Sequence, residues 1–261
     1  MRIRIEAAQV AASMLPGQFV MIRVSDCQDP LIGRALAVYD QVHDESGNPK
    51  AIDLVYLVKG KMTTMLARLL PGQEVDLVGP LGNAFSDASV DHLVLVAGGI
   101  GQTPMLVLAK EALGKSRFGS DSRHSGYAQR VTLCYGVRSK DYVAGLEQFE
   151  KAGIDVRLIT DDGSIGPPGR VTDLLKQVLD QADPSQSIRI ACCGPEVMME
   201  AVSAIADERK VAAEVSLETP MACGIGICFT CVAKVGQQDD WDYKRTCVEG
   251  PIFQAASIVW Q

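Results

Sequence analysis

Four cysteines lie within the last 40 residues of this 261-residue sequence, and their spacing is its most informative feature. They are Cys223, Cys228, Cys231 and Cys247, separated in turn by four, two and fifteen residues. Thiolates are soft ligands, and such a group in a chain that starts without an apolar signal segment indicates metal ligation before disulfides. The remaining cysteines stand alone or in one pair: Cys27, Cys134, Cys192 and Cys193.

The spacing of these four cysteines is typical of plant-type [2Fe–2S] ferredoxins. Gly224 and Gly226 permit the left-handed turns that let three thiolates of one short loop converge. Apolar neighbours would restrict water around a cluster: Met221, Ala222, Ile225, Ile227 and Phe229. The alternatives are a structural zinc site, which favours paired C-x2-C units, and a set of buried free thiols. We favour the iron–sulfur interpretation.

A second motif, rich in glycine, follows the apolar strand predicted over 93–97: Gly98-Gly99-Ile100-Gly101-Gln102-Thr103-Pro104. A glycine turn that opens a helix lets backbone N–H groups approach a pyrophosphate, with Thr103 as a cap and Pro104 in the first turn. Its alternative is a simple tight turn. Cys193-Gly194-Pro195 follows another predicted strand, and ligands of open parallel sheets bind at the carboxyl ends of strands. Together the two motifs predict a nucleotide site.

The elements that must position these motifs divide the chain into three units. Over residues 1–90, short β-like runs separated by turn signals predict an antiparallel barrel, with strands at 3–5, 18–24, 35–39, 52–58 and 74–78 and one helix at 62–70. Over 91–211, strands at 93–97, 131–135, 154–160 and 188–192 alternate with helices from 103 and near 140–151, 170–181 and 196–208. This alternation predicts a parallel α/β domain.

The polar tract 114–130 is expected to be an exposed loop, and the last unit, 212–261, begins with a predicted strand at 213–217. So short a unit lacks the area for a core of its own. The fold class is therefore a β-barrel, a parallel α/β domain and a small cluster domain.

Composition excludes several classes of function. The net charge of −7 opposes nonspecific nucleic-acid binding, because phosphate contacts need a basic surface. No apolar run approaches the roughly 20 residues of a membrane span, so the cytoplasm is the expected location. The three histidines, His43, His92 and His124, fall in predicted loops, and no residue has the pattern of a catalytic acid, base or nucleophile.

The order of these motifs resembles the ferredoxin-NADP reductase superfamily. The two C-terminal segments are similar to those of the electron-transfer subunits of class 1B dihydroorotate dehydrogenases: Met221-Ala222-Cys223-Gly224-Ile225-Gly226-Ile227-Cys228-Phe229-Thr230-Cys231 and Cys247-Val248-Glu249-Gly250-Pro251-Ile252-Phe253. The resemblance covers essentially the whole chain. It implies FAD in the barrel, NAD on the α/β domain and a [2Fe–2S] cluster in the last unit.

The resemblance also implies two flavin-binding segments, Arg34-Ala35-Leu36-Ala37-Val38 and Gly60-Lys61-Met62-Thr63-Thr64-Met65-Leu66. The first keeps the family's arginine but lacks its Pro and Ser. In the second, Met62 replaces a glycine. Arg34, Thr63 and the helix start at Thr63-Thr64 are kept in type.

The implied function is electron transfer between NAD and an FMN-containing catalytic subunit, in a heterotetramer. Alternatives are a diaphorase subunit of a ferredoxin-dependent transhydrogenase or a hydrogenase, and an iron–sulfur sensor whose flavin site has decayed. The sensor is motivated by Ala35, Ala37 and Met62. Asp141 beside Lys140 favours NAD over a nucleotide with a 2′-phosphate.

Overall fold

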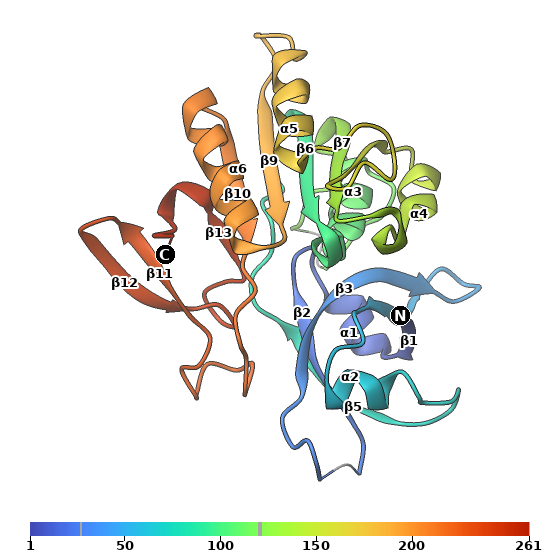
Figure 1. Ribbon diagram of the computed structural model, residues 1–261. Coiled ribbons are helices and arrows are strands. Elements are labelled where there is room, and N and C mark those ends of the chain that lie inside the picture. The colour runs from blue at the N-terminus through green and yellow to red at the C-terminus, as the bar shows by residue number, and fades with distance from the viewer. Residues whose placement is uncertain (27, 120–121, 261) are drawn as a thin grey trace.

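A computed structural model describes residues 1–26, 28–119 and 122–260, so that Cys27 lies outside the described residues. Within these ranges the strands form three sheets, of five, six and two strands. Figure 1 shows the N-terminal sheet below the α/β part, with the C-terminal hairpin to one side of both. The three units expected from the sequence thus meet around one central region.

The N-terminal sheet has the strand order β1-β4-β3-β2-β5, and every pairing in it is antiparallel. Its elements are β1 (Arg2–Glu6), α1 (Ala8–Ser13), β2 (Phe19–Val24), β3 (Arg34–His43), β4 (Pro49–Val55), α2 (Lys61–Leu66) and β5 (Val75–Leu81). Ile22, Ile52 and Leu54 are fully buried inside it. The predicted antiparallel unit is confirmed, although helix α1 was missed and helix α2 ends at Leu66 rather than at residue 70.

The six-stranded sheet has the order β13-β10-β9-β6-β7-β8, and only β13 runs antiparallel to its neighbour. Its strands are β6 (Val90–Gly98), β7 (Ala128–Val137), β8 (Asp155–Thr160), β9 (Ile188–Cys193), β10 (Ala212–Ser216) and β13 (Ile252–Gln254). Its helices are α3 (Met105–Ala112), α4 (Leu146–Lys151), α5 (Val171–Asp180) and α6 (Glu196–Arg209), with short 3₁₀ turns η1 (Gly99–Gln102), η2 (Lys140–Tyr142) and η3 (Ala255–Ser257).

Strand β6 shows why the sequence of a strand in this sheet is a continuous apolar run. Leu93 and Leu95 pack in one core together with α3 and α4. Val94 and Val96 pack in a second core together with α5 and α6. Both faces of the sheet are therefore covered by helices, as expected of parallel strands.

Two local expectations are wrong. The tract 114–130 is not simply an exposed loop, because Phe118 and Tyr127 are buried and Arg123 forms an ion pair with the buried Glu111, 2.8 Å between Nη2 and Oε2. His92 does not lie in a loop. It is a buried residue of β6, and its Nε2 lies 2.9 Å from Oγ1 of Thr132.

The last unit is built into the second sheet rather than set beside it. The strand predicted at 213–217 is β10, which pairs in parallel with β9. Strand β13 then pairs with β10 from the other side. Between them the chain forms the hairpin of β11 (Val232–Gln237) and β12 (Asp240–Arg245), which no sequence pattern had indicated.

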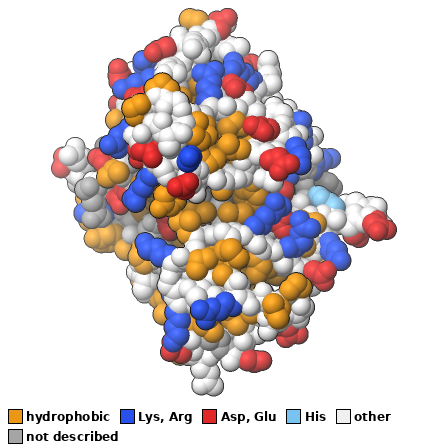
Figure 2. Space-filling view, turned by 45° about the vertical axis from the view of Figure 1, so that its right-hand side comes forward, with side chains coloured by type: hydrophobic (Ala, Val, Ile, Leu, Met, Phe, Trp, Pro, Cys, Tyr) orange, Lys and Arg blue, Asp and Glu red, His pale blue; other side chains and the backbone are white. Residues whose placement is uncertain are grey.

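The barrel and the α/β domain share packed contacts. Nζ of Lys110 on α3 lies 2.6 Å from Oδ1 of Asp40 on β3, and Tyr39 of β3 is buried in the core beside α3 and α4. Figure 2 shows apolar side chains across the middle of one face, with basic and acidic side chains interspersed around them. Among the described residues, none of the helices is long and apolar enough to cross a membrane.

Candidate functional site

The first three cysteines lie on the segment between β10 and β11. Gly224 and Gly226 adopt left-handed backbone angles, with φ of 72° and 85°, which let this segment fold back on itself. A Cβ atom at Gly224 would lie 2.4 Å from Cγ of Met21, so the segment packs directly against strand β2 of the barrel. We call residues 221–231 the cluster loop.

The β11–β12 hairpin explains the fifteen-residue gap before the fourth cysteine. Val232 pairs with Arg245 at the open end of the hairpin. Cys231 therefore precedes one strand where Cys247 follows the other, and the Thr246 N–H donates to the Cys231 carbonyl at 2.7 Å. Both Cys231 and Cys247 are buried, whereas Cys228 is exposed.

The thiols of Cys228 and Cys247 each interact with a neighbouring cysteine, Cys223 and Cys231 respectively, and Cys223 also acts on Cys247. Hydrogen bonds from Thr230 and then from Cys223 lower the pKa of the exposed Cys228 to about 6, which favours the metal-binding thiolate. Burial, followed by the contact with Cys231, raises the pKa of Cys247 to about 11. Each of the two pairs could supply the two ligands that one iron of a two-iron cluster takes from the protein.

A zinc ion would need all four thiols around one centre. Among the described residues, no three His, Cys, Asp or Glu side chains gather closely enough to hold a single ion. It is the spacing of the four cysteines that favours a [2Fe–2S] cluster over a structural zinc.

The two nucleotide motifs meet at the carboxyl ends of β6 and β9. A Cβ atom at Gly101 would lie 2.2 Å from the Cys193 carbonyl oxygen, and one at Gly98 would lie 2.8 Å from Cδ of Pro195. Gly99 has a φ of 54° and open space where a side chain would be. Only glycine allows this close approach, and the open side of Gly99 is a cradle suited to a phosphate.

The other residues of these motifs have structural positions. Thr103 is buried and makes no side-chain cap, because Pro104 occupies the N-cap position of α3. Burial raises the pKa of Cys193 to about 12, so its thiol stays protonated at neutral pH. Gly194 brings this turn against Gly98, with 3.0 Å between the Cβ position of Gly194 and the Gly98 nitrogen.

The first predicted flavin segment lies on β3. Arg34 is exposed at the start of the strand, and its Nη1 donates to the carbonyls of Ile32 and Gly33 at 3.0 and 2.9 Å. Ala35, Leu36 and Ala37 follow and are half-buried. Ala35 packs against the apolar group that contains Cys231 and Cys247, together with Phe19 and Met21. One residue of the predicted flavin segment thus packs with two of the four predicted cluster ligands.

The second flavin segment surrounds the start of α2. Met62, which stands where the family has a glycine, is fully buried in the barrel core, so its side chain does not enter the open side of the loop. The Thr63 hydroxyl accepts from the Lys59 N–H at 2.8 Å and donates to the Gly60 carbonyl at 3.2 Å, so it shapes the loop. Thr64 also donates to the Gly60 carbonyl, and Lys61 pairs with Asp29. Gly60 has open space beside it, which leaves room for a cofactor.

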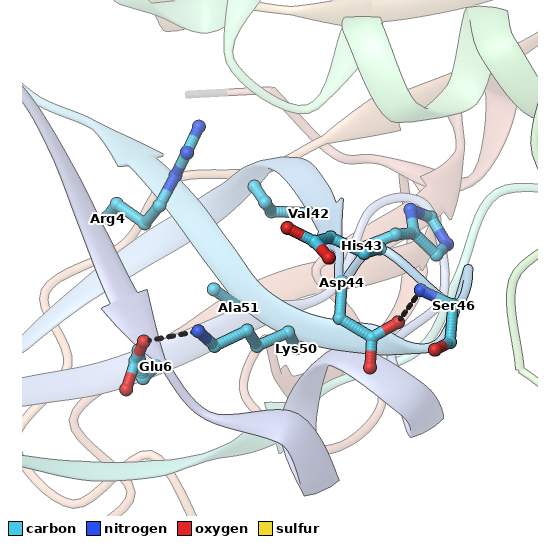
Figure 3. A pocket seen from close by; sticks show the side chains of 9 residues that line it. Arg4, Glu6, Val42, His43, Asp44, Ser46, Lys50 and Ala51 are labelled. Atoms are coloured by element: carbon cyan, nitrogen blue, oxygen red, sulfur yellow. Dashed lines mark hydrogen bonds and ion pairs between the residues drawn. The ribbon is translucent and has the colours of Figure 1, made fainter.

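A surface hollow of about 650 Å³ lies apart from these segments, on β1, β3, β4 and the β3–β4 turn (Figure 3). Several of its polar groups have partners. Nζ of Lys50 lies 2.9 Å from Oε1 of Glu6, and the Ser46 N–H donates to Asp44. The lining residues, none of them in a predicted site, are Arg4, Glu6, Val42, His43, Asp44, Glu45, Ser46, Lys50 and Ala51.

Family models match the chain in three parts. They describe an oxidoreductase FAD-binding domain over residues 1–85, an oxidoreductase NAD-binding domain over residues 95–204 and the iron-sulfur cluster binding domain of dihydroorotate dehydrogenase B over residues 218–259. Fold and site together define a flavin- and nicotinamide-dependent oxidoreductase with an iron–sulfur domain.

Comparison with known proteins shows which family within this class the chain belongs to. The electron transfer subunit of dihydroorotate dehydrogenase B (NAD(+)) from Desulforamulus reducens is 33% identical, over 98% of this chain and 91% of its own length. The same subunit of Geobacillus thermodenitrificans is 36% identical, over 97% and 90%. A solved NADH-dependent reduced ferredoxin-NADP oxidoreductase has a TM-score of 0.79 at 28% identity, covering 99% of this chain and 84% of that chain. The chain belongs to the family of dihydroorotate dehydrogenase B electron transfer subunits.

Proposed function

We propose that this chain passes electrons between a dihydroorotate-oxidising FMN subunit and NAD, in pyrimidine biosynthesis. The observation that carries the proposal is the apolar contact of Ala35, on the predicted flavin segment, with the group around Cys231 and Cys247. Electron transfer between two cofactors needs them close together, and this contact supplies a short, packed route between their sites.

Each unit of the chain has one part in this scheme. Arg34 and the loop at Gly60–Thr64 hold FAD on the barrel of residues 1–90, and the turns at Gly99–Gly101 and Cys193–Pro195 hold NAD on residues 91–211. The cysteine pairs Cys223–Cys228 and Cys231–Cys247 ligate the cluster within residues 212–261. When bound, FAD supplies the chemistry that connects a two-electron hydride carrier to a one-electron carrier.

The surrounding residues position these cofactors and exclude water. Gly101 packs against the Cys193 carbonyl and fixes the two nucleotide turns relative to each other. Burial raises the pKa of Cys193 to about 12, which favours the protonated thiol at neutral pH. Phe19 and Met21, both buried, line the region between β3 and the cluster loop and keep it apolar.

A second subunit completes the reaction. The sequence contains no residue with the pattern of a catalytic acid, base or nucleophile for the oxidation of a dihydropyrimidine. The FMN-containing catalytic subunit of a heterotetramer supplies that chemistry. The free cysteines of the described chain are consistent with a reducing cytoplasm as the location.

The decisive experiment compares the isolated chain with the reconstituted complex. Alone, the purified chain should transfer electrons from NADH to artificial dyes and should not oxidise dihydroorotate. Addition of an FMN-containing catalytic subunit should restore reduction of NAD by dihydroorotate. Substantial oxidation of dihydroorotate by the isolated chain would refute the proposal.

A different partner is the second candidate, favoured by the likeness to the NADH-dependent reduced ferredoxin-NADP oxidoreductase. In that case the same chain would accept electrons from NADH but would couple them to a subunit that reduces NADP. Failure of every dihydroorotate-oxidising subunit to bind this chain, with diaphorase activity intact, would favour this candidate.

A further inference from the structure

One basic side chain contacts the cluster loop at two places. Arg245 is the last residue of β12 and precedes Cys247 by two positions. Its Nη1 donates to the Gly226 carbonyl at 3.2 Å, and its Cζ lies 5.0 Å from the centre of the Phe229 ring. Its Nε lies 3.3 Å from Oε2 of Glu249, so the guanidinium joins the loop to the segment after the fourth cysteine.

Gly226 lies between Arg245 and the segment that contains Cys247, a predicted cluster ligand. Its carbonyl accepts from Arg245 at 3.2 Å, and its backbone N–H favours the thiolate of Cys247 electrostatically. The residue has a φ of 85°, and a Cβ atom there would lie 2.6 Å from Cγ2 of Val248, so no other residue type fits. Arg245 thus fixes a glycine that packs against Val248, the residue after Cys247.

Phe229 is the second point that Arg245 holds. It adopts a left-handed backbone with a φ of 56°, which is uncommon for a residue with a side chain, and the residue is 63% exposed. Stacking of a guanidinium on an aromatic ring stabilises such an arrangement. Phe229 lies between Cys228 and Cys231, so the conformation of this residue sets the path of the chain between two predicted ligands.

We propose that Arg245 is a positioning residue that sets the reduction potential of the cluster, by holding the Gly226 carbonyl and the Phe229 ring and so fixing the cluster loop between its predicted ligands. This inference rests on the cluster of the proposed function. Reduction adds negative charge to the cluster, so a nearby cation and loop N–H groups held towards the sulfurs favour the reduced form. Glu249 balances the charge of Arg245, since its carboxylate accepts from both the side chain and the backbone N–H of Arg245.

The test is a potentiometric titration of the cluster, followed by electron paramagnetic resonance, in the purified full chain. Arg245→Gln should make reduction of the cluster less favourable by about tenfold, which is 59 mV for a one-electron couple. The matched control is Lys244→Gln, which removes the same charge one residue earlier. Lys244 contacts Asp242 and Glu249 and makes no described contact with Gly226, so its substitution should change the potential less than threefold.

Glu249→Gln gives a prediction of opposite sign. In the unsubstituted protein the Arg245 backbone N–H donates to Oε2 of Glu249 at 2.8 Å. The glutamine amide keeps an oxygen that can accept this bond, but it lacks the negative charge that balances Arg245. The potential should therefore rise, whereas damage to folding would lower the cluster content of both variants and shift no potential in a defined direction. If Arg245→Gln binds no cluster, the reduction potentials of Arg245→Lys and Glu249→Gln are compared with that of the unsubstituted protein instead.

Iron and acid-labile sulfide are measured first in the unsubstituted protein. Their absence would refute the proposed cluster and with it the proposed function. A normal cluster content with equal potentials in Arg245→Gln and Lys244→Gln would overturn the role of Arg245 alone. A lower potential in Glu249→Gln would also overturn it.

Discussion

Substitution of Gly101 by Ala tests the nucleotide site at its tightest contact. The added Cβ would lie 2.2 Å from the Cys193 carbonyl oxygen and 2.8 Å from the Gly194 nitrogen. Both atoms belong to the backbone, so neither can rotate away as a side chain would. The two turns must separate by about 1.2 Å to restore ordinary van der Waals contact at 3.4 Å.

This displacement should affect both stability and rate. Overpacking of a tight contact costs about 1–3 kcal/mol of the free energy of unfolding. A shift of about 1 Å in a group that positions the reactants can lower the rate about 10²-fold. We therefore expect kcat/KM for NADH, measured with an artificial dye, to fall about 10²-fold. The cluster loop lies on other elements, so iron and sulfide content should not change.

Gly47→Ala is the control for a loss of stability that does not disturb the nucleotide turns. Gly47 lies in the β3–β4 turn with a φ of 83°, and a Cβ atom there meets no atom within 4 Å. Gly47→Ala should lower the free energy of unfolding, because alanine is strained at this left-handed backbone angle, and it should leave kcat/KM unchanged. If Gly101→Ala kept kcat/KM within twofold of the unsubstituted protein, the argument that these two turns form one nucleotide site would be wrong.

Replacement of Cys223, Cys228, Cys231 or Cys247 by Ser should remove iron and acid-labile sulfide. The control Cys134→Ser, at a buried thiol outside the cluster loop, should keep both. Stoichiometric zinc without sulfide in the unsubstituted protein would contradict the cluster. Burial, then Arg130 and Arg157, lower the pKa of His92 from 6.5 to about 4, so the neutral ring is favoured in the folded state. The free energy of unfolding should therefore fall as the pH drops from 6.5 towards 4, by up to about 1.4 kcal/mol per pH unit, and urea titrations of His92→Gln should show a flatter profile. Asp53 is buried between Arg2 and Arg4, so Asp53→Asn should lower the free energy of unfolding by about 2 kcal/mol. The exposed Asp76 pairs with Arg23, and Asp76→Asn should lower it little. Equal midpoints of the two variants in urea would argue against this difference.

Periodicity predicted most of the fold because burial dictates it. Strand β6 is apolar at every position from Leu93 to Ala97, and the structure covers it on both faces. Elements without such a signal were missed or misplaced. Residues near 140–151 form only a 3₁₀ turn and the short helix α4, since the chain at Gly145 takes a left-handed turn that interrupts the helix.

The cysteine spacing predicted the cluster ligands, but not what brings the fourth one close. The β11–β12 hairpin has half-buried and exposed residues, so its alternation of apolar and polar residues is weak. Arg245 was not singled out for a similar reason, because a single arginine near a cysteine has no motif. Only the register Val232–Arg245 shows that this side chain lies at the base of the hairpin, over the cluster loop.

The placement of β10 and β13 limits how this protein can be divided. Strand β10 is the partner of β9, and β13 covers the other edge of β10 five residues after Cys247. A fragment cut at residue 211 would expose the hydrogen-bonding edge of β9, and the excised C-terminal piece would carry two strands with no sheet to join. Transfer of the iron–sulfur unit to another reductase would therefore require the recipient to provide a matching open edge. For this chain the unit of recombination is the α/β domain together with its cluster, rather than the cluster domain alone.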